Sequence, residues 1–339
     1  MEKVTTIGLD LAKSVFQVHG IDAAGGVLLR RKLRRSALLD FFAALPPMLV
    51  GMEACGGAHY WARELTRLGH TVRLMPPPYV KPYAERGKTD AADAGAICEA
   101  VTRPTMRFVP AKTGAQQASL MELKVRDMLV RQRTRTVNAL RSHLAEYGIV
   151  AAQGRRVSEL IEVVRDGDDA RLPDPARDAL GELVAQIEAM EERIGRFDRR
   201  LVRHAREDET ARRLASIPGI GAIGATALAA IVPDPHGFAS GRHFAASLGP
   251  APKPHSSGGK ERLGRISRQG NSMLRRLLVL GATSRLRHAR RSPGTADWAA
   301  RLLARRPFKV VAVALASKMA RIAWALLARG GTYTTTAAA

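Results

Sequence analysis

Short apolar runs separated by turn residues fill the first hundred positions and predict alternating strands and helices. A meander of three strands is expected at residues 4–11, 15–21 and 27–33, with Ala24-Gly25-Gly26 as its last turn. The order then continues as helix, strand, helix, strand and helix, at residues 36–45, 48–52, 60–68, 71–75 and 90–101. Ser36 is expected to be the N-cap of the first of these helices. The pattern therefore predicts an N-terminal α/β domain.

The middle of the chain has a different periodicity, in which apolar residues recur every three or four positions. One such seam comprises Leu180, Leu183, Ile187, Met190, Ile194, Phe197 and Leu201. A helix at about residues 116–147 repeats it with Val137, Leu140, Leu144 and Tyr147. Both seams are typical of a coiled coil. The connecting segment, which contains Gly154, Gly167, Pro173 and Pro175, predicts a turn between antiparallel helices. The helices could pair within one chain or with a second copy.

From about residue 211 the pattern predicts a mostly helical region. Ser216 to Gly221, before an alanine-rich helix, resembles a helix-hairpin-helix turn. In such a turn, Gly219 and Gly221 would expose backbone N–H groups to a nucleic-acid phosphate. A tight turn in a packed helical domain explains the same residues. Residues 214–232 are the only uncharged window expected to resemble a membrane span, but Pro218 and the glycines interrupt it, so no membrane partner is expected.

Charge and cysteine usage indicate the partner and the compartment. The 339-residue chain has 54 Lys and Arg residues against 31 Asp and Glu, a formal net charge of +23, which predicts a polyanionic partner. The two cysteines, Cys55 and Cys98, lack metal-ligand spacing and indicate a reducing cytoplasm. The first residues lead directly into a strand, so no signal peptide is expected.

Four acidic residues are the candidate metal ligands. Asp10 and Glu53 end two of the predicted strands, and Asp90 and Asp93 lie at i and i+3 on one face of a helix. Any one of them could be a solvated surface carboxylate. Together, in these elements, they predict a site for magnesium (Mg2+), which prefers oxygen ligands and assists phosphodiester chemistry.

Ser257 is the candidate nucleophile, because it lies in a glycine-rich loop among cations that would favour its alkoxide. An ordinary loop serine explains the same residue, and Ser256 beside it is an alternative nucleophile. His255 could assist proton transfer. The cations expected to contact nucleic acid are Lys253, Lys260, Arg262, Arg265, Arg268, Arg275 and Arg276.

The order of elements, with acids on the first and fourth strands and on the last helix, resembles the RNase H-like fold in its RuvC-like form. Nearly the whole chain is similar to the DEDD transposases of the insertion-sequence-110 type, including the 1111 subgroup. The motifs that carry this resemblance are G-L-D-L-A-K (8–13), M-E-A (52–54), K-T-D-A-A-D-A (88–94), I-P-G-I-G (217–221), S-S-G (256–258) and R-I-S-R-Q-G-N (265–271).

The resemblance implies a magnesium-binding tetrad of Asp10, Glu53, Asp90 and Asp93 and a nucleophilic Ser257. It implies a recombinase that is guided by a structured non-coding bridge RNA pairing with donor and target DNA. Serine attack would give a covalent 5'-phosphoserine link and a free 3'-OH, followed by religation. Each composite site would join two subunits, in a dimer or a tetramer formed as a pair of dimers.

We expect three domains and a tail. Residues 1–105 would form the RuvC-like domain, 106–208 a helical coiled-coil region, 209–330 the serine transposase domain, and 331–339 a disordered tail. Two other functions stay open: a metal-only, RuvC-like nuclease, which would still cleave as Ser257→Ala, and a catalytically inert nucleic-acid-binding protein. We expect the protein to lie in the cytoplasm of a bacterium, in association with the nucleoid.

Overall fold

The computed structural model describes residues 3–84, 89–151, 157–232, 234–291 and 298–334, without the side chains of 289–291. The chain forms two compact units, Met1–Gln117 and Ala118–Ala339. The division into three domains stays a prediction, and the predicted disordered tail lies outside the described residues from position 335 onward.

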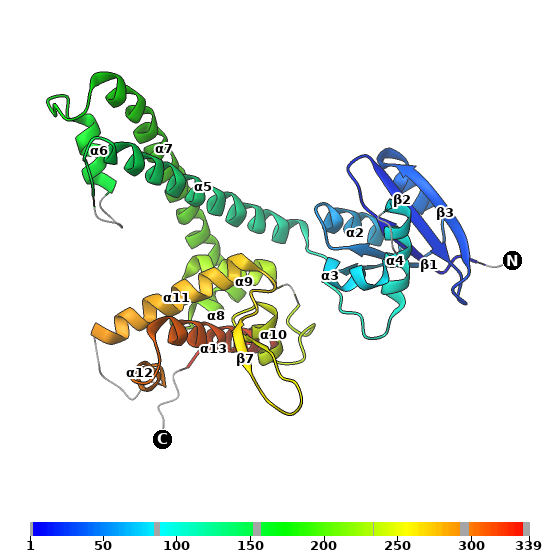
Figure 1. The fold of residues 1–339 in the computed structure, drawn as a ribbon. Coiled ribbons are helices and arrows are strands. Elements are labelled where there is room, and N and C mark those ends of the chain that lie inside the picture. The colour runs from blue at the N-terminus through cyan, green and yellow to red at the C-terminus, as the bar shows by residue number, and fades with distance from the viewer. Residues whose placement is uncertain (1–2, 85–88, 152–156, 233, 292–297, 335–339) are drawn as a thin grey trace. The chain divides into compact units, whose positions relative to one another are not determined.

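A mixed five-stranded sheet is the centre of the first unit (Figure 1). Its strands are β1 (Thr6–Asp10), β2 (Val15–Ile21), β3 (Val27–Arg34), β4 (Leu49–Glu53) and β5 (Thr71–Met75). They lie in the order β3-β2-β1-β4-β5. The first three strands are antiparallel, whereas β4 runs parallel to β1 and β5 parallel to β4. The sheet is consistent with the expected RNase H-like domain.

Successive side chains of each strand point to opposite faces of the sheet, and both faces are covered by helices. Ile7 and Leu9 on β1, with Phe16 on β2, pack beneath α1 (Leu38–Ala43) and α2 (Ala58–Arg67). The opposite face is covered by α4 (Asp90–Thr102), which packs on β1, β2 and β4. At Gly8 on β1, an added Cβ would overlap the carbonyl oxygen of Ala94 and lie 2.5 Å from the backbone nitrogen of Cys98. Glycine at position 8 therefore lets α4 lie directly against the sheet.

The start of α1 was predicted incorrectly. Ser36 lies inside the short 3-10 turn η1 (Arg35–Ala37), and α1 begins after Ala37 without a side-chain cap. The sequence analysis also missed α3 (Pro77–Val80) and the 3-10 turn η2 (Lys81–Tyr83), which follow β5. Each spans a single turn, too short for a periodic pattern.

Two long helices, α5 (Gly114–Ala145) and α7 (Asp174–Glu207), extend along the first part of the second unit. Leu140 and Leu144 of α5 share an apolar cluster with Ile187 of α7, and Leu129 of α5 shares another with Ile194 of α7. The helices therefore pair within one chain. The connection, where only a turn was expected, contains the helix α6 (Val157–Arg165); Gly154 lies outside the described residues.

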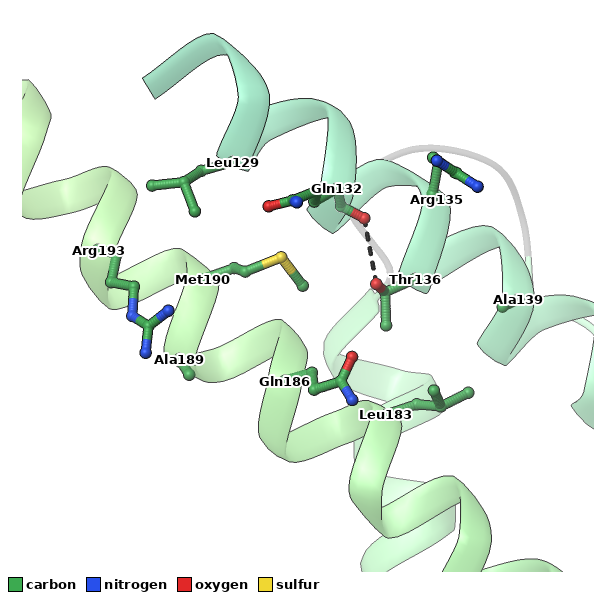
Figure 2. Close-up of a pocket in the computed structure, with 10 residues that line it drawn as sticks. All are labelled: Leu129, Gln132, Arg135, Thr136, Ala139, Leu183, Gln186, Ala189, Met190 and Arg193. Carbon is green, nitrogen blue, oxygen red and sulfur yellow. Dashed lines mark hydrogen bonds between the residues drawn. The ribbon is translucent and has the colours of Figure 1, made fainter. Parts of the chain in front are cut away.

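Between these two clusters, α5 and α7 leave an open groove of about 580 Å³ (Figure 2). Gln132 and Thr136 line it on α5, and Gln186 and Met190 line it on α7. Polar glutamines in the middle of the seam do not interlock as apolar knobs would. Pairing of this region with a second copy stays a prediction.

The rest of the second unit is a helical domain. Its helices are α8 (Glu209–Ala215), α9 (Ala222–Ile231), α10 (Gly241–Ser247), α11 (Ser272–Arg291), α12 (Trp298–Leu303) and α13 (Phe308–Arg329). Val311, Leu315 and Met319 of α13 are buried, and this helix packs on α10 and α11. A two-stranded hairpin, β6 (Pro252–Pro254) and β7 (Leu263–Ile266), lies between α10 and α11 in the sequence.

The expectation that residues 214–232 are the only membrane-like window was wrong. By length and composition α13 also qualifies, with a mean hydropathy of 1.7 in its most apolar window. Its apolar residues belong to the core of this unit, and Lys318 and Arg321 interrupt its length. We therefore interpret α13 as a core helix.

Candidate active site

Asp10 and Glu53 lie next to each other at one end of the sheet. Leu9 of β1 pairs with Met52 of the parallel strand β4, so the next residues, Asp10 and Glu53, end their strands side by side. Both are half-buried. The pKa of the Cys55 thiol is raised, first by burial and then by the negative charges of Glu53 and Asp10. This effect indicates that the two carboxylates share one region of negative potential.

Asp90 and Asp93 form the acidic first turn of α4. The side chain of Thr89 caps this helix by accepting a hydrogen bond from the Ala92 N–H at 3.2 Å. Toward the other end of α4, the Cys98 thiol donates to the carbonyl of Thr6, at the start of β1. Because α4 thus runs antiparallel to β1, its first turn lies toward the end of the sheet that carries Asp10. The sequence analysis did not single out Thr89, although a threonine directly before an acidic helix was a usable cap signal.

The four carboxylates lie toward one end of the fold without forming a metal-binding cluster. Across the described residues, no three Asp, Glu, His or Cys side chains are close enough together to hold an ion. Their donor atoms are all carboxylate oxygens, which suit magnesium. Lys88, the first residue of the K-T-D-A-A-D-A motif, lies outside the described residues. The donor chemistry fits the metal, and the metal-binding roles of the four acids stay predictions.

Ser257 lies at the tip of the β6–β7 hairpin. The Lys260 N–H donates to the Ser257 carbonyl at 3.1 Å, and Gly258 and Gly259 between them have φ values of 57° and 75°. Two positive φ angles in a two-residue connection are typical of a type I′ turn, which matches the twist of a hairpin. Two successive glycines therefore hold Ser257 at an exposed tip.

The pairing of the hairpin places cations on the Ser257 side. Ser257 pairs with Lys260, and the N–H of His255 donates to the carbonyl of Arg262 at 2.7 Å. Because side chains alternate between the two faces of a strand, Lys253, His255, Lys260 and Arg262 share the face of Ser257. Glu261 belongs to the opposite face. The local field on the Ser257 side is thus positive.

Ser256 differs from Ser257 in its hydrogen bonding. The Ser256 hydroxyl oxygen accepts a hydrogen bond from the Arg262 N–H at 3.3 Å. Among the residues that the structure describes, the Ser257 hydroxyl makes no hydrogen bond. The His255 ring packs over Gly264, where an added Cβ would lie 2.6 Å from the ring. This arrangement favours Ser257 over Ser256 as the nucleophile, although the role of either residue stays a prediction.

Two of the seven predicted nucleic-acid cations have partners within the protein. Arg275 donates to the carbonyls of Leu248 at 3.0 Å and Gln269 at 2.7 Å, and Arg276 forms an ion pair with Asp127 of α5. The structure thus gives both a structural role. The other five are exposed and form no ion pair with any described residue: Lys253, Lys260, Arg262, Arg265 and Arg268.

The two glycines of the I-P-G-I-G motif have different surroundings. The N–H of Ile220 donates to the carbonyl of Ile217 at 2.9 Å, and Gly219 has a φ of 97°, as in a type II turn with proline before the glycine. Gly219 also packs against Gly281 of α11. Gly221 precedes α9, and an added Cβ there would meet open space. A tight packed turn accounts for Gly219, and a phosphate contact at either glycine stays a prediction.

Comparison with known proteins gives matches over both units. Residues 7–149 match a transposase family model named for DEDD and IS110, and residues 211–296 match the Transposase IS116/IS110/IS902 family. The chain is 50% identical to a family 20 transposase of Pseudomonas aeruginosa, over 97% of this chain and 98% of that protein. It is 40% identical to the transposase for insertion sequence element IS1328 of Yersinia enterocolitica, over 98% of this chain and 99% of that one. It is also 40% identical to the transposase for element IS1111A of Coxiella burnetii, over 98% and 92%.

Proposed function

Because this chain belongs to the IS110/IS116 family of insertion-sequence transposases, and so is a DNA transposase, we propose that it exchanges DNA strands through a covalent phosphoserine intermediate under the guidance of an RNA. The observation that carries this proposal is the hydroxyl of Ser257, which has no hydrogen bond among the described residues and lies on the cationic face of an exposed hairpin. A serine that served only to stabilise the loop would have its hydroxyl bonded, as Ser256 does.

In the proposed reaction, the Ser257 oxygen attacks the phosphorus of a DNA phosphodiester. The new bond joins serine to the 5' side of the break, and the bond to the 3' oxygen breaks, so the 3' oxygen leaves and takes up a proton. Lys260 and Arg262 would stabilise the charge of the five-coordinate phosphorus. A 3'-OH from the partner strand then attacks the phosphoserine and restores the serine. One phosphodiester replaces another, so no external energy source is needed.

Asp10, Glu53, Asp90 and Asp93 would hold magnesium, which supplies charge stabilisation at the phosphodiester when it is bound. The protein contributes the placement of these acids. Asp10 and Glu53 are fixed by adjacent strands, and α4 carries the other two toward the same end of the sheet. Because the acids come from three elements, β1, β4 and α4, they could approach one another once a bound cation neutralised their repulsion.

A second copy and a guide RNA are the further partners that we propose. The open groove between α5 and α7, with Leu129, Leu183 and Met190 in its lining, offers apolar surface for another helix pair (Figure 2). Dimers, and tetramers formed from them, would then complete each site with residues from two subunits. The net charge of +23 is suited to RNA as well as DNA. Genomic DNA as the substrate implies the bacterial cytoplasm.

The experiment is a denaturing gel of the full chain with magnesium, its RNA and labelled donor and target DNA. Wild type and Ser256→Ala should give a protease-sensitive protein–DNA adduct, whereas Ser257→Ala and Asp10→Asn should lose it. Ser256→Ala is the matched control because it removes the neighbouring hydroxyl of the same hairpin. Cleavage by Ser257→Ala without an adduct would support the metal-only nuclease, and DNA binding without cleavage by wild type would support an inert binding protein.

A further inference from the structure

The edge strand β3 has a concentration of cations that the proposed chemistry does not use. Between positions 30 and 35 the chain reads Arg-Arg-Lys-Leu-Arg-Arg. β3 is the outermost strand beside β2, so one of its edges is unpaired within the sheet (Figure 1). Positive charge on an edge strand can simply prevent the pairing of sheets from different molecules. The distribution of these cations between the two faces allows a choice between that explanation and a binding site.

The register of β2 and β3 assigns the cations to two faces. Leu33 of β3 is buried opposite Phe16, and Arg31 lies over the ring of Phe41 in α1 at 5.6 Å, so these residues belong to the α1 face. The alternate residues belong to the α4 face: Arg30, Lys32 and Arg34. All three are exposed and form no ion pair with any described residue. We call these three residues the β3 strip.

The β3 strip is continuous with the acidic end of the sheet. Asp10 of β1 pairs with Gln17 of β2, and Gln17 pairs with Lys32 of β3, so one row across three strands joins an acid of the candidate site to the middle of the strip. Neighbouring strands are about 4.8 Å apart, which puts Lys32 roughly 10 Å from Asp10 between Cα atoms. A lysine side chain at that distance can contact a phosphate next to one held at Asp10.

The surface between the strip and α4 is open. A groove of about 790 Å³ has Arg30 and His19 on one side and Ala92 and Gly95 of α4 on the other. Alternate residues of β3 are about 6.6–6.8 Å apart, a step comparable to that between successive phosphates of an extended DNA strand. Asp22 closes the groove in the β2–β3 turn, at the end of β3 away from Arg34. Arg30 lines this groove, whereas Lys32 and Arg34 lie beyond its lining, toward the end of β1 that carries Asp10.

We propose that Arg30, Lys32 and Arg34 bind the phosphates of a DNA strand and hold it beside Asp10 and Glu53. The proposal rests on the proposed function, because it names the surface that delivers DNA to the acids. DNA is favoured over RNA because the strip adjoins residues whose substrate is a DNA phosphodiester. The opposite face of the same strand, with Arg31 packed on Phe41, takes no part.

The test compares neighbouring residues of one strand in the full chain. Lys32→Gln and Arg31→Gln each remove one charge from β3, on opposite faces. Binding to a fluorescent single-stranded DNA oligonucleotide is measured by anisotropy over a range of salt concentrations, in EDTA so that no cleavage occurs. Loss of one phosphate contact should lower the salt slope by about 0.7 for Lys32→Gln and leave it unchanged for Arg31→Gln. Equal effects of the two substitutions would overturn the proposal and leave edge protection as the role of the strip.

A second readout localises the contact. A photoreactive benzoylphenylalanine at position 32 should crosslink to labelled DNA under ultraviolet light, and the same residue at position 31 should not. Crosslinking at position 32 to the guide RNA in place of DNA would overturn the proposal. If wild type forms the phosphoserine adduct and position 32 never crosslinks, the DNA-binding role of the β3 strip is wrong and the proposed function stands. If position 32 crosslinks DNA and wild type forms no adduct, the DNA-binding role of the β3 strip is supported and the proposed function fails. Thermal unfolding of each variant verifies that it is folded.

Discussion

The reactivity of an individual side chain in this protein depends on its surroundings, and the two cysteines illustrate this. Cys98 is buried on α4 against β1, and its burial raises the pKa of the thiol to about 11. Cys55 is exposed in the loop after β4, beside Glu53. A thiol is reactive only as the thiolate, so the two positions should differ sharply in reactivity.

We predict that a thiol reagent at pH 8 modifies one cysteine per native chain and two per chain in denaturant. The pKa of both thiols is raised, so the native site should be Cys55 because it is exposed whereas Cys98 is covered by the fold. The folded state keeps the Cys98 proton up to about pH 11, above the ordinary value of 9.0. The unfolded state loses that proton first, so this group makes the protein less stable as pH rises from about 9 to about 11. Peptide mapping of the modified cysteine tests the assignment, and rapid native modification of Cys98 would contradict it.

At the scale of helices and turns, close backbone contacts decide where glycine is required. Gly219, in the turn between α8 and α9, and Gly281, inside α11, lie against each other so closely that a Cβ on Gly281 would overlap the Gly219 carbonyl oxygen. Gly181, inside α7, has open space where its Cβ would be. The same substitution should therefore have opposite effects in two helices of one unit.

We predict that Gly281→Ala lowers the free energy of unfolding by about 3 kcal/mol, because overpacking must push α11 away from the turn. Gly181→Ala should raise it by about 0.5–1 kcal/mol, since alanine is the better helix former and nothing obstructs it. Urea unfolding followed by circular dichroism measures both variants. A stable Gly281→Ala variant would show that the contact between the turn and α11 is looser than described.

The sequence predicted elements well wherever periodicity was strong. The strands that end at Asp10 and Glu53 were predicted almost to the residue, because short apolar runs bounded by polar or turn residues mark buried strands, and the helix that begins at Asp90 follows a threonine N-cap. Ser36 was predicted incorrectly because a serine also suits a 3-10 turn. The partners of Arg275 and Arg276 could not be predicted, since carbonyls and an aspartate distant in sequence supply them. The gathering of the acids at one end of the sheet followed from strand order, whereas their side-chain positions did not.

The whole molecule acts on its partners mainly through charge. With a net charge of +23, the protein has far more cations than its internal ion pairs use. Eight of the exposed cations are in the regions proposed to meet nucleic acid: four in the β6–β7 hairpin, Arg268 just after it, and three in the β3 strip. Each phosphate contact releases counterions, so affinity should depend steeply on salt.

We predict that affinity for DNA of random sequence falls by about a thousandfold or more between roughly 50 mM and 200 mM salt, the range expected for about six to ten phosphate contacts. Fluorescence anisotropy with a double-stranded oligonucleotide measures the slope. An uncharged polymer crowder at matched osmolarity serves as the control. A shallow slope would mean that apolar or base contacts dominate the affinity, which would contradict the prediction that the excess cations bind phosphates.

The two-glycine turn that holds Ser257 has a consequence for the natural history of mobile DNA. Gly258 and Gly259 both adopt backbone angles that other residues reach only at a cost of about 1 kcal/mol or more each. A copy of the element that had ceased to move would no longer be selected to keep them, and most single-nucleotide changes in a glycine codon replace the glycine. In a survey of related copies, replacement of either glycine should therefore mark a copy that has ceased to move even where the acids and the serine are intact.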